Sequence, residues 1–363
     1  MTASIDPTLR MRVNGGAGRG GHVGMKHGAG GTAMRRLIAE TLTRGFVDAP
    51  LPTPGSIGLA AFDDGAALQI APDQWLVLTT DSHVVQPIEF PGGDIGRLAI
   101  AGTVNDLAMM GATEPLGLTC GVIIEEGFSL ETLERVQRSM QAACAEAGVS
   151  VVTGDTKVMR KGELDGLVVN TAGVALTRRV VRDAGLAPGD LLIVTGSIGD
   201  HGMALMAVRN GFEIEGDLTS DVAPINTLVR AALQVVPGAI VAMKDPTRGG
   251  VAGSLHEMAT KGGVGILVRE QSVPVKPAVR ALAEMLGIEP LHVANEGKAV
   301  IGVRGGMAVA ERVLAALREH PLGRDAAIVG EALAEHVGRV IVDTGLGRRL
   351  VSEPEGEPLP RIC

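Results

Sequence analysis

Short apolar segments typical of strands alternate with longer segments typical of helices, and this alternation constrains the fold more than any other feature of the chain. Trp75–Thr80 and Val149–Thr153 have the composition of buried strands. Ile95–Met110 and Leu130–Ala147 have helical character, and Gly148 is placed to end the second helix. We therefore expect a globular chain in which strands and helices follow one another.

A linker divides this pattern into two units. Residues 183–190 contain two glycines, one proline and two aspartates, a composition typical of a linker and turn. The strand Leu191–Thr195 opens the second unit. With 363 residues the chain is long enough for two domains, because single cores stop growing near about 250–300 residues. Further helices are predicted near residues 222–235, 250–261, 276–287 and 307–319. We predict a flexible glycine-rich arm at 1–24, an N-terminal domain at 25–178, a C-terminal domain at 179–347 and a flexible tail at 348–363.

The composition argues against several classes of partner. The formal net charge is −8, and the chain has one Trp, five Phe and no Tyr, so we expect no nucleic-acid partner. The N-terminus lacks the apolar core of a signal peptide, and no run of 18 apolar residues predicts a membrane span. Cys120, Cys144 and Cys363 lie too far apart for a disulfide framework or paired zinc ligands. We therefore expect a cytoplasmic protein that binds neither nucleic acid nor membrane.

The end of the chain combines a stiff, charged segment with a terminal thiol. Its last twelve residues, SEPEGEPLPRIC, contain three prolines and three glutamates, which favours an extended, solvated conformation. Cys363 is the last residue, whereas a prenylation signal places the cysteine four residues from the end. Two interpretations stay open: an incidental thiol, or an arm that spans up to ~40 Å and carries the thiol into an active site.

Aspartates recur at predicted strand ends and in apolar surroundings, although any one of them alone is more often a helix cap or turn residue. Asp106 stands out because its predicted helix is otherwise nearly all apolar, and a buried carboxylate is costly without a partner. Several carboxylates converging on one cleft would suit Mg²⁺, which prefers oxygen ligands and bridges to phosphates. The recurring aspartates are Asp63, Asp64, Asp81, Asp106, Asp155, Asp200 and Asp245.

No Walker A motif occurs in the sequence, so a P-loop nucleotide site is excluded. We expect phosphates to be held instead by Mg²⁺, by Lys157 and by the amides of a glycine loop. That loop contains His27, Gly28, Gly30 and Gly31.

Taken together, these stretches resemble the HypE family, the carbamoyl dehydratases of hydrogenase maturation. Shorter motifs are shared with aminoimidazole ribonucleotide synthetase, selenophosphate synthetase and thiamine-monophosphate kinase, and the terminal PRIC separates this family from them. The matching segments are HGAGG at 27–31, DDGAA at 63–67, TTDS at 79–82, GTVNDLAMMGA at 102–112, TGDTKV at 153–158, IGDHG at 198–202, DPTRGG at 245–250, ANEGK at 294–298 and PRIC at 360–363.

The resemblance implies a two-domain α/β (α+β) fold of the aminoimidazole ribonucleotide synthetase type, in which the N-terminal sheets of a homodimer pair into an interface barrel beside a C-terminal α/β domain. It also implies an ATP-dependent dehydration of an S-carbamoyl group on Cys363 to a thiocyanate, the source of the iron-bound cyanide of [NiFe] hydrogenase. The implied partners are the carbamoyltransferase HypF and a HypC–HypD complex. ATP and Mg²⁺ are expected between the domains. The implied metal ligands are Asp63, Asp64, Asp81, Asp106 and Asp155. The further ATP or phosphate contacts are His27, Gly28, Gly30, Gly31, Asn105, Thr156, Asp245 and Arg248.

The dehydration suggests specific catalytic groups, because oxide is a very poor leaving group and must first be phosphorylated. We assign Lys157 to the carbamoyl oxygen or the phosphate, Glu296 as the base and His201 as a second choice of base. A surface salt bridge for Lys157 and a loop carboxylate for Glu296 are the alternative interpretations. Other functions that stay open are a selenophosphate synthetase, a small-molecule kinase and a non-enzymatic scaffold that presents the thiol.

Overall fold

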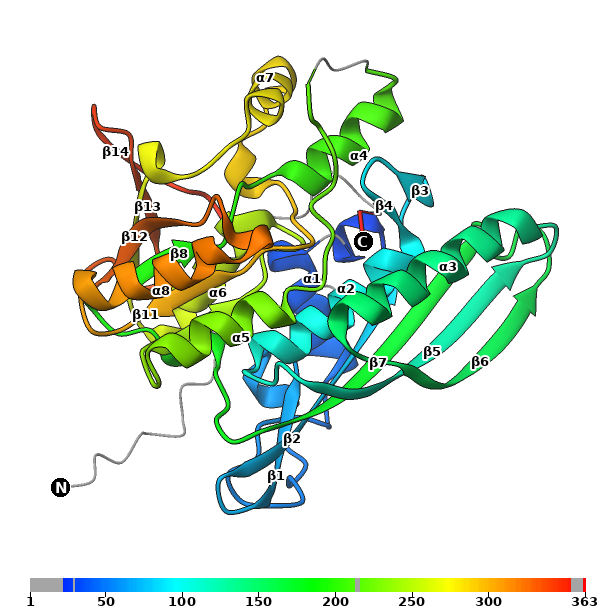
Figure 1. The fold of residues 1–363 in the computed structure, drawn as a ribbon, viewed down its shortest axis with the longest axis horizontal. Helices are drawn as coiled ribbons and strands as arrows, with labels where there is room; N and C mark the ends of the chain where they lie inside the picture. Colours follow the sequence, from blue (N-terminus) through cyan, green and yellow to red (C-terminus); the bar gives the residue numbers. More distant parts are fainter. Residues whose placement is uncertain (1–21, 29, 213–215, 354–361) are drawn as a thin grey trace.

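Two α/β units lie side by side in the computed structural model, which describes residues 22–28, 30–212, 216–353 and 362–363 (Figure 1). The first unit contains a five-stranded sheet with the order β1-β2-β7-β5-β6. The second contains a seven-stranded sheet with the order β14-β13-β10-β12-β8-β11-β9. The predicted two-domain α/β architecture is confirmed. Among the described residues, no helix is both long and apolar enough to cross a membrane.

The first unit places two helices beside its sheet. The side chain of Asp94 accepts hydrogen bonds from the backbone N–H groups of Gly96 and Arg97, at 2.7 and 3.0 Å, and so begins the long apolar helix α2. Gly148 adopts the left-handed conformation and ends α3, as predicted. The elements are β1 (Ala66–Ala71), β2 (Gln74–His83), β3 (Glu89–Phe90), β4 (Gly93–Asp94), α2 (Ile95–Met109), β5 (Pro115–Glu125), α3 (Leu130–Ala147), β6 (Val151–Met159) and β7 (Leu167–Thr177).

Strand β6 differs from the prediction of a buried strand at Val149–Thr153. It begins at Val151, runs to Met159 and forms an edge of the sheet, paired with β5. Val152 and Val158 are 66% and 69% exposed, so the apolar residues that favour a strand are covered on neither face. The sheet of the single chain is open, and the described residues form no closed barrel.

The helices of the second unit mostly lie where the sequence predicts them. Helix α4 was missed because buried residues surround it instead of following one face, so it has no amphipathic pattern. The predicted domain end at residue 347 falls one strand too early, since β14 pairs with β13. The elements are η4 (Asp183–Gly185), β8 (Leu191–Val194), α4 (Asp200–Asn210), α5 (Asn226–Val235), β9 (Ile240–Lys244), α6 (Gly250–Gly262), β10 (Gly265–Arg269), α7 (Pro277–Leu286), β11 (Val300–Val303), α8 (Met307–Glu319), β12 (Ala327–Leu333), β13 (Val340–Asp343) and β14 (Arg348–Leu350).

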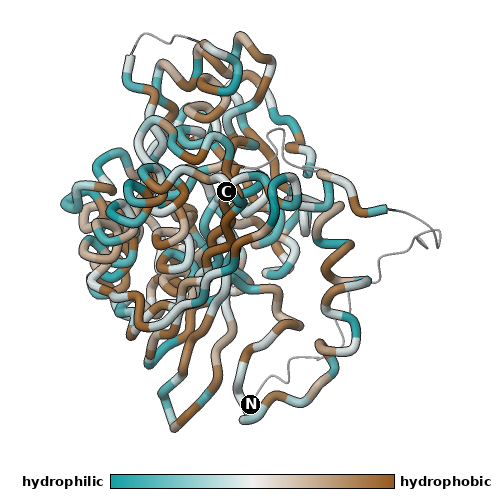
Figure 2. The backbone as a smooth tube through the Cα atoms, turned by 90° about the vertical axis from the view of Figure 1, so that its right-hand side faces the viewer, coloured by the Kyte–Doolittle hydropathy of each residue, from teal (hydrophilic) through white to brown (hydrophobic). Residues whose placement is uncertain are grey.

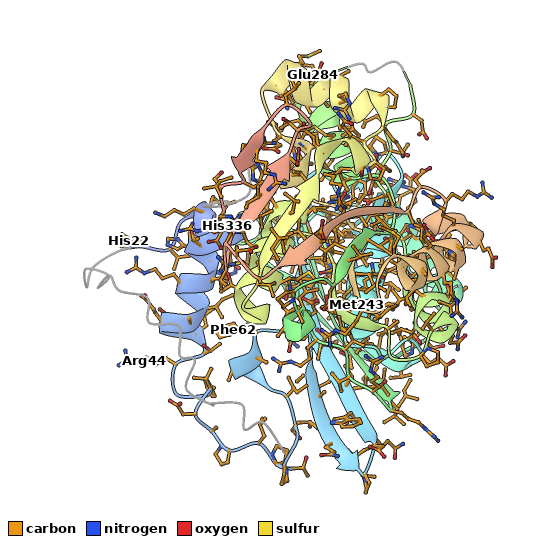
Figure 3. All side chains as sticks on the ribbon, turned by 90° about the vertical axis from the view of Figure 1, so that its left-hand side faces the viewer. His22, Arg44, Phe62, Met243, Glu284 and His336 are labelled. Carbon is orange, nitrogen blue, oxygen red and sulfur yellow. The ribbon has the colours of Figure 1, made fainter. Side chains whose placement is uncertain are left out.

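Both described ends of the chain approach the second unit. Helix α1 (Gly31–Leu37) continues into a π-helical turn, Ile38–Leu42, on the flank of the molecule (Figure 3). Arg35 on α1 pairs with Glu257 on α6 at 3.4 Å. The C-terminus lies near the middle of the molecule in two views at right angles (Figures 1 and 2). The glycine-rich arm and most of the predicted tail, residues 1–21 and 354–361, lie outside the described residues.

Candidate active site

Four carboxylates from both units gather around the C-terminal half of α2. Asp106 lies on α2, Asp81 on β2, Asp64 just before β1 and Asp245 just after β9. The hydroxyl of Thr79 donates to Oδ2 of Asp106 at 2.9 Å. Burial, followed by the charges of Asp245, Asp81 and Asp64, raises the pKa of Asp106 well above its ordinary value. The cluster therefore holds more negative charge than its own surroundings neutralise.

The guanidinium of Arg248 stands among these acids, just before the start of α6. The charge at Cys363 has the largest effect on Arg248 and raises its pKa, with Asp81 and Glu296 acting in the same direction against burial. Burial alone would raise the pKa of Asp81, but the charges of His83 and Arg248 hold it at about 2. Arg248 thus links the C-terminal residue to the carboxylate cluster.

Glu296 is a buried carboxyl group of the same site, with a side chain 3% exposed. Its backbone N–H donates to Oδ1 of Asp221 at 3.0 Å, and its Oε1 has no hydrogen-bond partner among the described residues. Burial, together with the charges of Asp245 and Asp81, raises its pKa well above the ordinary value. A carboxylate with a raised pKa is a stronger base, which suits the role predicted for Glu296.

The described end of the chain is docked in this region. Ile362 is 2% exposed and Cys363 is half-buried, and the charge of this last residue, which bears the terminal carboxylate, is the largest influence that raises the pKa of Arg248. The imidazole Nε2 of His201, on α4, lies 2.7 Å from the backbone carbonyl oxygen of Ile362. The terminal thiol therefore shares one site with Glu296 and Arg248, in keeping with the arm interpretation of the tail.

Both ring nitrogens of His201 are engaged, which disagrees with its assignment as a second choice of base. A carbonyl oxygen only accepts, so Nε2 carries the proton and donates to Ile362. Nδ1 lies 2.7 Å from the hydroxyl of Ser220 and accepts from it. Burial lowers the pKa of His201, which favours this neutral ring. No lone pair of the ring is left for a substrate proton.

Two residues predicted to contact the nucleotide or metal are occupied elsewhere. The side-chain amide of Asn105 donates to the carbonyls of Ala223 and Glu296, and its oxygen accepts from the N–H of Ile225 at 2.8 Å. It joins α2 to the second unit. Asp63 accepts from Nε of Arg182 at 2.7 Å, so its charge is already paired.

The predicted contacts on β6 lie away from the cluster within one chain. Asp155 and Lys157 form an ion pair of 2.8 Å, and both side chains are about two-thirds exposed. Across the sheet Ser82 pairs with Asn170, Asn170 with Gly121 and Gly121 with Asp155. Ser82 and Asp155 are therefore three strand spacings of about 4.8 Å apart, which is roughly 14 Å. Thr156 follows on the same exposed strand.

The predicted glycine loop is divided between two environments. His27 and Gly28 end an exposed 3₁₀ turn, Met25–Gly28, in which the imidazole of His27 caps Gly24. Gly30 instead packs on Arg248 with φ of 77°, and an added Cβ would lie 2.9 Å from the Cβ of Arg248. Only the glycine allows this close approach without strain. Gly30, at the end of the loop, therefore reaches the site.

Sequence reasoning missed Lys244, the buried cation at the edge of the cluster. Its ammonium lies 2.5 Å from Oδ1 of Asp64 and 3.3 Å from Oε2 of Glu257. Burial opposes its charge, but Asp64 and Glu257 raise its pKa well above the ordinary value. The available signal was a lysine at the end of an apolar strand, directly before the DPTRGG motif.

The cluster fits Mg²⁺ in charge and donor type. No three His, Cys, Asp or Glu side chains among the described residues are arranged to hold a metal ion by themselves. Mg²⁺ usually takes one or two carboxylates together with substrate phosphates, so such a cage is not required. The crowded oxygens of Asp64, Asp81 and Asp106 offer these ligands, although Oδ1 of Asp64 also pairs with Lys244 and Oδ2 of Asp81 with His83.

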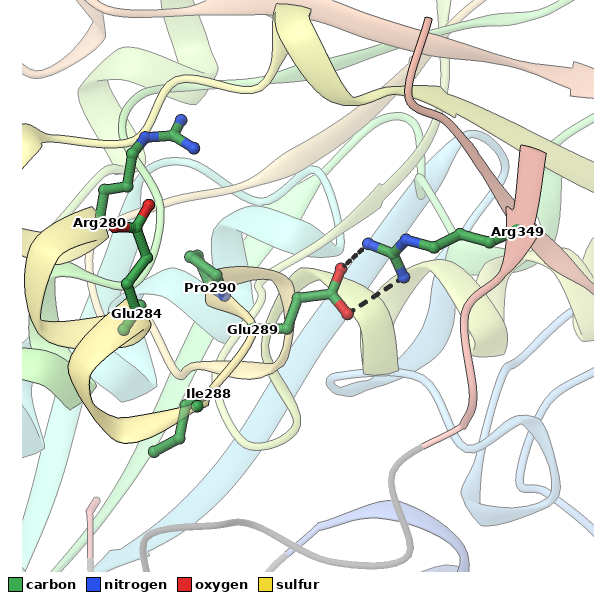
Figure 4. Close-up of a pocket in the computed structure, with 8 residues that line it drawn as sticks. Arg280, Glu284, Ile288, Glu289, Pro290 and Arg349 are labelled. Atoms are coloured by element: carbon green, nitrogen blue, oxygen red, sulfur yellow. Dashed lines mark hydrogen bonds and ion pairs between the residues drawn. The ribbon is translucent and has the colours of Figure 1, made fainter. Parts of the chain in front are cut away.

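Two pockets are lined by other residues than the four carboxylates of the cluster. One, of about 360 Å³, lies beside α7, where Glu289 pairs with Arg349 across its wall (Figure 4). The other, of about 700 Å³, lies where the two units meet. Its buried acids are matched by lysines, with Asp221 at 3.1 Å from Lys298. Neither pocket is lined by a residue predicted for catalysis or nucleotide binding.

Comparisons with known proteins place these features in one family. The AIR synthase related protein N-terminal domain matches residues 62–177, and the corresponding C-terminal domain matches residues 187–343. The carbamoyl dehydratase HypE of Azotobacter vinelandii is 44% identical over 95% of this chain and 98% of its own length.

Two solved structures share the fold at similar identity. The crystal structure of a HypE–HypF complex contains a chain that is 42% identical with a TM-score of 0.80, covering 88% of this chain and 99% of that one. The crystal structure of the hydrogenase maturation protein HypE in complex with ATP has 41% identity and a TM-score of 0.76, covering 92% and 98%.

Proposed function

The chain belongs to the HypE family of carbamoyl dehydratases, and from this premise we propose that it uses ATP to dehydrate an S-carbamoyl group on its own Cys363 to a thiocyanate. The thiocyanate would supply the cyanide ligand of the iron in [NiFe] hydrogenase. Because its relatives over most of the chain are carbamoyl dehydratases, a selenophosphate synthetase or a small-molecule kinase is not favoured.

One observation carries the proposal: the terminal cysteine is docked where the acids and the arginine of the site converge. Cys363 dominates the electrostatics of Arg248, which also responds to Asp81, Glu296 and Asp106. A thiol presented there is a substrate for the site and not an incidental end of the chain.

The proposed chemistry proceeds in two steps on the tethered substrate. The carbamoyl oxygen attacks the γ-phosphorus of ATP, and the bond from that phosphorus to ADP breaks. The S-carbamoyl group is now phosphorylated on its oxygen and stays attached to the sulfur of Cys363. Both N–H protons are then lost as the carbon–oxygen bond to phosphate breaks, leaving S–C≡N, ADP and inorganic phosphate. Glu296 would accept an N–H proton, and Arg248 and Lys157 would stabilise negative charge on the carbamoyl oxygen and the phosphate.

Asp64, Asp81 and Asp106 would hold Mg²⁺ together with the phosphates of ATP, and the ion would neutralise phosphate charge during phosphoryl transfer. Asp245 lies close to this cluster and Gly30 packs on Arg248, and both would contribute to the nucleotide site, with Gly31 following Gly30 in the chain. The ATP complex of a relative supports this part of the proposal.

We propose a homodimer as the complete enzyme. Strand β6 is an exposed edge, and exposed edges pair readily with another strand. Within one sheet Asp155 lies roughly 14 Å from Ser82, the residue that follows Asp81 on β2. Strand β6 of a second copy would therefore bring Asp155, Thr156 and Lys157 to the site. The paired sheets would then form the interface barrel.

The carbamoyl group would arrive from HypF, and the cyanide would leave to a HypC–HypD complex in the cytoplasm. A relative's structure in complex with HypF supports the first of these partners. In this proposal the tail reaches either partner from beyond Val351 and Ser352, which are still hydrogen-bonded to the second unit.

Mass spectrometry of the C-terminal peptide tests the reaction. The full chain is incubated with HypF, carbamoyl phosphate and ATP, and the peptide is expected to pass from the carbamoyl form to a form one water lighter. Cys363→Ala should show neither form, and Cys144→Ala should behave as the wild type. Full cyanide-donor activity in Cys363→Ala would refute the proposal.

A further inference from the structure

We infer that the protein selects the end of its tail through a dedicated subsite for Ile362, in which His201 is a positioning residue. This subsite consists of His201, Gly202, Phe90 and Ala294. The inference rests on the proposed function, because it explains how Cys363 is presented to Arg248 and Glu296.

The backbone of Ile362 is held by a hydrogen-bond chain with one possible direction. The N–H of Val222 donates to the hydroxyl of Ser220 at 3.1 Å, and that hydroxyl donates to Nδ1 of His201. Because the Ile362 carbonyl can only accept, Nε2 carries the ring proton and donates to it at 2.7 Å, and the neutral ring then accepts from the serine hydroxyl at Nδ1. This series of hydrogen bonds fixes the Nε2–H of His201 as the donor to the carbonyl of Ile362.

The ring of His201 is also held in orientation. It is fully buried, and Phe90 packs edge-on against it with 5.4 Å between the ring centroids and an interplanar angle of 88°. The imidazole is therefore fixed before the tail arrives, which lowers the cost of docking.

The side chain of Ile362 occupies an apolar site whose floor is a glycine. Ile362 belongs to one buried cluster with Phe90 and Ala294. A Cβ added at Gly202 would lie 3.2 Å from Cδ1 of Ile362, tighter than an ordinary contact. The missing side chain at Gly202 makes room for Val293, whose Cγ1 would lie 2.5 Å from an added Cβ, and also for Ile362, and a shorter side chain at 362 would leave a cavity.

Recognition therefore resides in the penultimate residue, one position away from the reacting thiol. His201 fixes the carbonyl, the apolar site fixes the side chain, and Cys363 is placed beside Arg248, where its sulfur can carry the carbamoyl group. The site is predicted to accept a detached peptide that ends in the same residues, because these contacts involve only the tail's last peptide group and the Ile362 side chain.

Alkylation of Cys363 in the full chain tests this subsite without ATP or a carbamoyl donor. The rate of iodoacetamide labelling is followed by peptide mass spectrometry, with Cys120 and Cys144 in the same molecule as reporters of the intact fold. Ile362→Val should speed labelling of Cys363 by about 4-fold and Ile362→Ala by roughly 10–100-fold, as each buried methylene is removed.

The histidine is tested by a graded pair and a matched control. His201→Ala should speed labelling by roughly 5–10-fold, and His201→Gln, which retains an N–H donor, should restore most of the protection. His320→Ala is the control, since the described side chain of His320 bonds the hydroxyl of Thr227 in the second unit.

A competitor peptide separates recognition of the dipeptide from tethering. A synthetic peptide with the sequence of residues 354–362 followed by serine should speed labelling of Cys363 in the wild-type chain, and the same peptide with alanine at 362 should not. Unchanged labelling in Ile362→Ala and with both peptides would overturn the inference.

The outcome for the histidine and the outcome for the proposed reaction remain separable. If His201→Ala also exposes Cys120 or Cys144, that variant has lost its fold and the Ile362 series, which leaves the core intact, decides. If the labelling series behaves as expected but no thiocyanate forms, the subsite stands and the proposed reaction fails.

Discussion

The buried cluster around α2 and the exposed strand β6 carry the two halves of the predicted site, and they are built in opposite ways. In the cluster, Asp106 and Glu296 have raised pKa values because burial and like charges act on them together. On β6, Asp155 and Lys157 neutralise each other in solvent. The pKa of Asp155 is lowered, first by its hydrogen bond to Lys157.

This contrast shows that a single chain completes the buried half of the predicted site and leaves the half on β6 incomplete. Buried charges with raised pKa values and without sufficient partners store unfavourable energy that a cation or substrate relieves. An exposed ion pair stores almost none, and contributes little to stability. The cluster is thus prepared for its ligands within one chain, whereas β6 acquires a role when another surface covers it.

The largest expected effect is on the rate of thiocyanate formation, when Glu296 in the buried cluster is changed. Glu296→Gln should lower the rate of ATP-dependent thiocyanate formation by about 10²–10⁴-fold, because an amide cannot accept the substrate proton. The fold should persist, since glutamine has the same shape and nearly the same volume as glutamate. Phosphate release from carbamoylated protein measures the rate. Glu289→Gln, in the surface ion pair of Figure 4, is the matched control. Wild-type turnover in Glu296→Gln would break the comparison.

Strand β6 is tested by mixing two inactive chains. Lys157→Ala should lower turnover by about 10²-fold through lost charge stabilisation, without changing the melting temperature. If β6 serves the partner's site, equal mixing of Lys157→Ala with Glu296→Gln should restore roughly a quarter of the wild-type rate, because half the dimers are hybrids with one intact site. Subunit exchange followed by a turnover assay measures this. No restoration would place both residues in one chain's site.

The next smaller effect is expected on stability, when Asn105, which joins α2 to the second unit, is changed. Asn105→Ala should lower the free energy of unfolding by about 2–3 kcal/mol, because it leaves the N–H of Ile225 and two carbonyls without partners. Urea unfolding of the variant beside Lys157→Ala provides the measurement and its control. Equal stability of the two variants would contradict the role of Asn105 as a bridge between units.

The smallest effect concerns the pH dependence of the cluster. Burial, followed by the charge of Asp64, raises the pKa of Asp245 to about 7, from about 4 in an unfolded chain. The folded protein therefore retains a proton that the unfolded chain has lost. This stabilisation is full below about pH 4 and disappears as pH rises through 7.

An asparagine side chain does not titrate, so the stability of Asp245→Asn relative to the wild type should rise by about 2.5 kcal/mol between pH 5 and pH 8, at about 1.4 kcal/mol for each pH unit below the folded pKa. Calorimetry at both pH values without nucleotide, repeated with Asp155→Asn on β6, measures the difference. If the stabilities of Asp245→Asn and the wild type change with pH in parallel, Asp245 does not have the raised pKa on which this prediction rests.

Local patterns predicted much of the fold and many of the site's residues. Helix α3 with its glycine stop and helices α6 to α8 follow from periodicity and capping. The exposure of β6 did not follow, because an apolar strand has the same composition whether a neighbour covers it or not. The partners of Asn105 and His201 did not follow either, since they lie 118 and 161 residues away in the chain.

The sequence by itself determined the chemistry that the chain carries: a terminal thiol, recurrent aspartates and a glutamate in known motifs, because motifs record residue types at short spacing. Only the tertiary structure decided that Cys363, Arg248 and Glu296 meet while Lys157 stands apart. Distances between remote residues depend on how the two units pack, and burial sets the pKa of each group only once that packing exists.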